Sequence, residues 1–107
     1  MSLEVSLTND ANEPVFAASL SGHLTQMAAQ AGIYTILWQP QEQGITIASQ
    51  IIRPLADGLQ DLSINQAVYE CFESPVGGGK WVDLVSWCSS YLQACRLNPA
   101  ATVQTSC

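Results

Sequence analysis

Charged residues are scarce in this sequence. Asp, Glu, Lys and Arg make up 11% of the 107 residues, against about 25% in an average soluble domain. A surface with so few charges must include neutral polar or apolar areas, and extended apolar areas usually mark contacts with another chain. We therefore expect this protein to bind a partner protein or to form a homodimer.

Basic residues are the scarcest charged group. Arg53, Lys80 and Arg96 face nine acidic residues, which gives a formal net charge of −6. Three cations neutralise few phosphates, so the composition argues against nucleic-acid binding and against binding to an anionic membrane surface. If the partner is another protein, long-range attraction favours a basic one.

The sequence also lacks a long apolar run, a secretion signal and the usual metal-binding motifs. No stretch of 18 apolar residues occurs, so no membrane span is predicted, and we expect a cytoplasmic protein. Zinc sites commonly need Cys-x-x-Cys pairs or several histidines. Here the four cysteines form no such pair and His23 is the only histidine. We expect no metal, no cofactor, and cysteines that are reduced and mostly buried.

The residues that are present follow the pattern of a single α+β domain spanning 1–107. Leu3, Val5 and Leu7 alternate with polar residues, which predicts a strand with one buried face. Turn residues at 9–14 and an apolar segment at 15–20 complete a hairpin. A last strand is predicted over 101–106. We expect a three-stranded antiparallel sheet, formed by the hairpin and the C-terminal strand, packed against three to four helices.

Helical spacing of apolar residues fills the region between the hairpin and the last strand. One predicted helix starts at Leu24 and ends at Gly32, which is a suitable C-terminal cap. The β-branched residues of 33–38 also suit a strand, but their position before Gln39-Pro40 favours a helix. A short helix near 66–72 and a helix over 81–97 follow.

The longest predicted helix begins at Thr46, a good N-terminal cap. Pro54 should kink this helix or divide it, because proline lacks the backbone donor and clashes with the preceding turn. The apolar residues expected to face the core recur at intervals of three or four: Ile47, Ile51, Leu55, Leu59 and Leu62.

A glycine-rich loop precedes the last predicted helix. Gly77-Gly78-Gly79-Lys80 is similar to the end of a phosphate-binding loop, but that motif needs glycine at position 74 and Ser or Thr at position 81. Ser74 and Trp81 occupy these positions. We interpret the segment as a connecting loop, which could still hold an anion on its backbone N–H groups.

His23 and four acidic residues, Asp57, Asp61, Glu70 and Glu73, are the candidates for chemistry. A distant Ser or Cys could pair with His23 as a nucleophile, while a structural role at the start of the helix it precedes is the alternative. Asp57 and Asp61 are four residues apart and share one helix face. They could act as a general acid and base, but we favour a solvated face that can meet a basic partner.

Aromatic residues are the candidates for a binding surface, because they dominate the energetic anchors of interfaces. Trp81 and Trp87 are six residues apart on one predicted helix and therefore point to different sides of it. Trp81 is predicted in the core and Trp87 at an exposed or interfacial position. Trp38 is the other aromatic candidate.

Several short motifs recur together in a group of small bacterial and phage proteins that this chain resembles over nearly its full length. The most specific are Leu37-Trp38-Gln39-Pro40 and Tyr91-Leu92-Gln93-Ala94-Cys95. Others are Gly22-His23-Leu24, Ala31-Gly32-Ile33-Tyr34, Gly79-Lys80-Trp81 and Asn98-Pro99 with Ala101-Thr102-Val103. The group has Asn after the His, where this chain has Leu24, and an Asn-Gly-Trp-Gly loop, where this chain has Pro75-Val76-Gly77-Gly78-Gly79. The resemblance implies a fold and an intracellular location, and it carries no activity to transfer.

Together these features favour a non-enzymatic protein-interaction domain, of the kind encoded beside toxins or on mobile elements, that neutralises or adapts another protein. The interaction candidates are Trp87, Trp38, His23, Asp57, Asp61, Gly78 and Lys80. The alternative is a small enzyme or ligand-binding domain with a cleft around His23, Trp38 and the 76–80 loop. A closed pocket of at least about 300 Å³ that joins His23 to a carboxylate would favour the enzyme. A flat apolar patch carrying Trp87 or Trp38 would favour the interaction domain.

Overall fold

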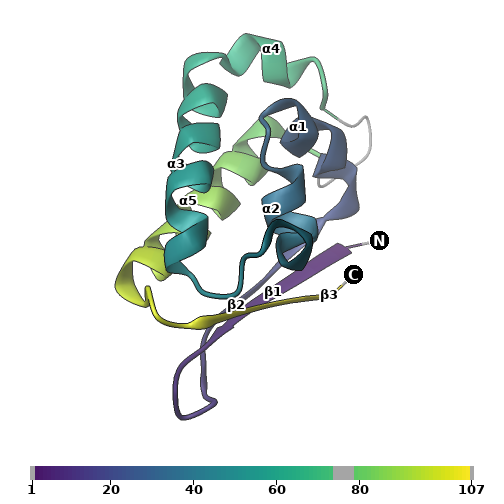
Figure 1. The fold of residues 1–107 in the computed structure, drawn as a ribbon. Coiled ribbons are helices and arrows are strands. Elements are labelled where there is room, and N and C mark those ends of the chain that lie inside the picture. The colour runs from purple at the N-terminus through teal and green to yellow at the C-terminus, as the bar shows by residue number, and fades with distance from the viewer. Residues whose placement is uncertain (1, 74–78, 107) are drawn as a thin grey trace.

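A computed structural model describes residues 2–73 and 79–106 of the chain. A hairpin comes first, then the helices, and a third strand closes the chain (Figure 1). In chain order the elements are β1 (Ser2–Thr8), β2 (Pro14–Ser21), the 3₁₀ turn η1 (Gly22–Leu24), α1 (Thr25–Gln30), α2 (Tyr34–Trp38), the 3₁₀ turn η2 (Pro40–Gln43), α3 (Ser49–Ile64), α4 (Gln66–Glu70), α5 (Trp81–Leu97) and β3 (Thr102–Ser106).

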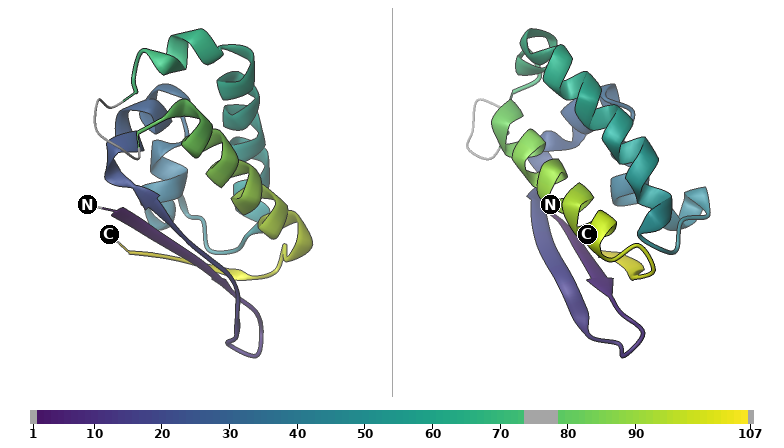
Figure 2. Two further views of the ribbon diagram at one scale, coloured as in Figure 1. Left: turned by 180° about the vertical axis from the view of Figure 1, so that it is seen from behind. Right: turned by 90° about the vertical axis from the view of Figure 1, so that its left-hand side faces the viewer.

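The predicted three-stranded antiparallel sheet is confirmed. The strand order is β2-β1-β3, so the N-terminal strand is central and the other two are edges. Leu3, Val5 and Leu7 of β1 are buried, whereas Glu4 between them is exposed. The period of two therefore places one face of the sheet against the helices, and none of the helices in the described residues lies on the other face (Figures 1 and 2).

The two edges of the sheet differ. The outer side of β3 is partly covered, because Ile47 forms a bridge with Thr102 and the Val103 N–H donates a hydrogen bond to the Thr46 carbonyl at 2.9 Å. No described segment pairs with the outer side of β2. The register between β1 and β2 shifts at the turn end, where Val15 is the extra residue of a β-bulge. From Phe16 to Ser21 the pairing with β1 is regular.

The helices α1 and α2 follow the predicted pattern. Gly32 comes just after α1 with a φ of 78°, a left-handed conformation that glycine adopts at little cost. This turn lets α2 begin at once, so the helical interpretation of 33–38 is confirmed for Tyr34–Trp38. The short helix predicted near 66–72 is present as α4.

The helix α3 differs from its prediction in two respects. It begins at Ser49 rather than after Thr46, because the preceding segment pairs with β3 and the Gln50 side chain accepts hydrogen bonds from the backbone N–H groups of Thr46 and Ile47. Ile47 consequently lies outside the helix and is partly exposed. Pro54 does not divide α3, which continues as one element to Ile64.

The helix α5 connects the layers of the structure. It contacts β2 on one side and α3 on the other, and the right-hand view of Figure 2 shows it between them. Leu84, Cys88, Leu92 and Cys95 are buried, as the helical spacing predicted. Tyr91, an aromatic candidate for a binding surface, is buried as well, and Val85, predicted to be buried, is only partly so. Trp81 is half-buried, and its indole N–H donates a hydrogen bond to the Leu62 carbonyl at 2.9 Å. This bond links the start of α5 to the end of α3.

One hydrophobic core joins the inner face of the sheet to all the α-helices. No buried charged side chain interrupts it in the described part of the chain, and its polar side-chain groups belong to tyrosine and cysteine. None of the helices in residues 2–73 and 79–106 is both long and apolar enough to cross a membrane.

Candidate functional site

His23 lies beside an open cavity of about 400 Å³. The residue is exposed in η1, and Ser21 rather than His23 caps this turn, since the Ser21 hydroxyl accepts a hydrogen bond from the His23 N–H at 3.2 Å. The cavity joins His23 to Cys71 and Glu73 but opens to solvent. Within the described residues, neither Trp38 nor Lys80 lines this cavity. Of the cleft predicted around His23, Trp38 and the glycine loop, the cavity therefore contains only His23.

Glu73 already has a structural role at this cavity. Its Oε2 accepts a hydrogen bond at 2.8 Å from the backbone N–H of Trp81, the first residue of α5, and its Oε1 lies 3.9 Å from Lys80 Nζ. The N-terminus of a helix stabilises a carboxylate through its unpaired N–H groups. The Cys71 thiol, in turn, donates to the Ala67 carbonyl of its own helix at 3.5 Å. We assign no catalytic role to these groups.

The two predicted acidic residues of α3 have different surroundings. Both are exposed, but Asp61 accepts hydrogen bonds from the Asn65 amide at 2.8 Å and from the Tyr69 hydroxyl. Burial of Tyr69, followed by its contact with Asp61, raises the pKa of Tyr69 to about 12. The hydrogen bond from Tyr69 to Asp61 therefore links α4 to α3, whereas Asp57 lies on the solvated face of α3. Gly78, the other candidate of the glycine-rich loop, lies outside the described residues.

The two tryptophan candidates occupy separate places. Trp38 is half-buried and stacks on Tyr34, with ring centroids 5.1 Å apart. Trp87 is half-buried on α5 and packs against Tyr91, with centroids 5.3 Å apart, and Tyr91 stacks on Phe16 of β2 at 5.7 Å. Trp87 thus marks the boundary between α5 and β2. Its indole N–H and the Tyr91 hydroxyl are buried without a hydrogen-bond partner in the described part of the chain.

One side of α5 runs beside β2 and is nearly free of charge. Trp87, Ser90, Ala94 and Leu97 recur on it at intervals of three or four residues. Between this side and β2 lies a groove of about 340 Å³, lined by Val15 and Phe16 from the strand and by Ser90, Gln93, Ala94, Leu97 and Asn98. Leu97 is 71% exposed, although it is a large apolar residue.

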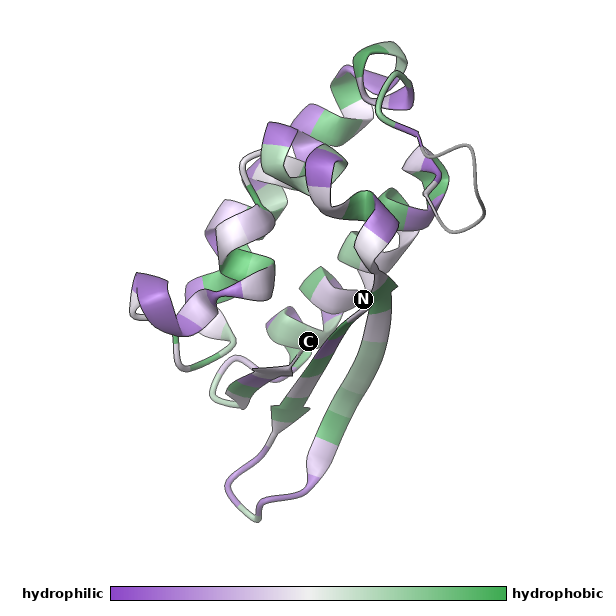
Figure 3. Ribbon diagram, turned by 90° about the vertical axis from the view of Figure 1, so that its right-hand side faces the viewer, coloured by the Kyte–Doolittle hydropathy of each residue, from purple (hydrophilic) through white to green (hydrophobic). Residues whose placement is uncertain are grey.

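The strand beside this groove carries no charged side chain at all. Natural proteins protect exposed edge strands with charges, prolines or bulges, because unpaired backbone groups invite another chain to pair. Pro14 and the bulge at Val15 protect only the turn end of β2. Along β2 Figure 3 shows mainly green and pale colours, whereas hydrophilic purple gathers in the hairpin turn. We call Phe16–Ser21, together with Trp87, Ser90, Ala94 and Leu97, the β2 edge surface.

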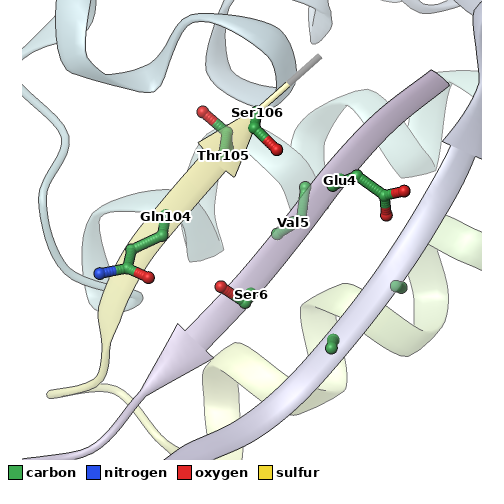
Figure 4. Close-up of a pocket in the computed structure, with 8 residues that line it drawn as sticks. Glu4, Val5, Ser6, Gln104, Thr105 and Ser106 are labelled. Carbon is green, nitrogen blue, oxygen red and sulfur yellow. The ribbon is translucent and has the colours of Figure 1, made fainter. Parts of the chain in front are cut away.

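The helix-free face of the sheet has a shallow hollow of about 450 Å³ (Figure 4). Small or short side chains, such as Ser6 and Ala17, create the depression. Glu4 is the acidic residue of its lining, and its carboxylate accepts a hydrogen bond from the Ser19 hydroxyl. The hollow is open and lacks the enclosing apolar walls of a small-molecule site. We read it as part of the uncovered sheet surface.

Burial shifts the pKa values of titratable groups in the core. Burial raises the pKa of the Cys88 and Cys95 thiols to about 12, and burial followed by the nearby Cys95 raises that of Tyr91. The thiolate is the reactive form of cysteine, and burial disfavours it at both thiols. In residues 2–73 and 79–106 no group of three or more His, Cys, Asp or Glu could hold a metal ion.

Sequence reasoning selected Trp87 but missed the strand beside it. The absence of charge from 14 to 21 is visible in the sequence. The meaning of this absence depends on β2 being an edge with which no described segment pairs on its outer side. Strand order is a long-range property that local sequence does not give. Of the three cysteines in the described residues, Cys88 and Cys95 are buried and Cys71 is exposed, so the expectation that the cysteines are mostly buried is met by two of the three.

Comparison with known proteins found no matching protein family, no matching curated protein and no matching solved structure. The functional interpretation of the chain therefore rests on its own geometry.

Proposed function

We propose that this chain is a non-enzymatic protein-interaction domain that binds through its β2 edge surface. One observation carries the proposal: an uncharged edge strand has a regular backbone from Phe16 to Ser21, and no described segment pairs with its outer side. Such an edge can accept a strand of another chain, because main-chain hydrogen bonds supply affinity and side-chain pockets supply specificity.

The neighbouring side of α5 strengthens this proposal. It adds exposed Leu97 and the half-buried Trp87 next to the strand, so an incoming chain would gain apolar contacts as well as backbone pairing. Aromatic residues are common anchors of interfaces. The His23 cavity gives less support to an enzyme, because its carboxylate already caps α5.

Two double variants test the proposal. Ala17→Glu with Leu97→Gln places a charge and a polar group on the β2 edge surface. The control, Ala67→Glu with Ile64→Gln, makes the same chemical changes at exposed positions of α4 and α3, where Ile64 is 70% exposed against 71% for Leu97. Both variants carry the same net charge.

Each protein is immobilised and exposed to an extract of the cell that produces it, with mass spectrometry of what is retained. We expect one protein, whether this chain or another, to bind both the wild type and the control. The edge variant should retain at least about tenfold less of it, which corresponds to a loss of about 1.4 kcal/mol in binding free energy. If both variants retain this protein equally, or if the wild type retains no specific protein, the proposal is refuted.

A further inference from the structure

No further inference is drawn: the strongest candidate, the uncharged outer side of β2 with the adjacent side of α5, is the surface that the proposed function already uses, and nothing in the described part of the structure shows what covers it.

Discussion

Replacing Gly58 by alanine should destabilise this protein, although alanine is the better helix former. Gly58 is a buried residue inside α3, where the substitution normally stabilises by about 1 kcal/mol. A Cβ atom at this position would lie 2.2 Å from Ile33 Cγ2 and 3.3 Å from the Ala31 carbonyl oxygen. Carbon atoms pack at about 3.5–4.0 Å, and Ile33 is itself fully buried, so the side chain cannot simply turn away into solvent.

The magnitude follows from two opposing terms. Overpacking a core costs about 1–3 kcal/mol, and the helix-propensity gain returns about 1 kcal/mol. The net expectation is a loss of about 1 kcal/mol, which lowers the thermal midpoint by about 4 °C or more for a domain of this size. Urea and thermal denaturation followed by circular dichroism measure both quantities.

A second substitution identifies the cause. Ile33→Leu removes the Cγ2 atom that meets the new Cβ, so Gly58→Ala should cost at least about 1 kcal/mol less in that background than in the wild type. If Gly58→Ala instead raises the free energy of unfolding by about 1 kcal/mol, α3 does not pack against Ile33 as closely as the structure shows.

Two further predictions concern ionisable groups. Folding raises the Tyr69 pKa from 10.0 to about 12, so the folded chain keeps a proton that the unfolded chain releases. This contribution to stability is fully present below pH 10 and should decline from pH 10 to 12. Chemical denaturation at these pH values should show a smaller decline of the unfolding free energy in Tyr69→Phe than in the wild type. An equal decline in both proteins would contradict the assignment. In a chain whose terminal cysteine is replaced, a thiol reagent should modify Cys71 rapidly and reach Cys88 and Cys95 only on unfolding. Rapid modification of all three would refute their burial.

Local periodicity predicted most elements of the fold. The alternation of Leu3, Val5 and Leu7 and the helical spacing over 81–97 record which side of each element is buried, and both segments adopt the predicted structure. Prediction failed at the start of α3, because Thr46 and Ile47 are held by β3 rather than by the helix that follows them. Such a contact joins residues more than fifty positions apart and leaves no local signature.

The candidate site was accessible from sequence only in part. The scarcity of charge indicated an uncovered surface, and Trp87 was identified from its spacing to Trp81. The edge position of β2 was not identified, because it depends on β3 pairing with the other side of β1. The role of Glu73 was also missed, since the residue that it caps lies eight positions further along the chain.

By itself the sequence determined the α+β class, the acidic balance and the main helices and strands, because side-chain period and composition act over a few residues. Only the tertiary structure decided that β2 is an uncovered edge, that α5 lies beside it with an uncharged side, and that Gly58 must remain small. These properties arise from which elements pack together, and packing is set by the fit of surfaces that are distant along the chain.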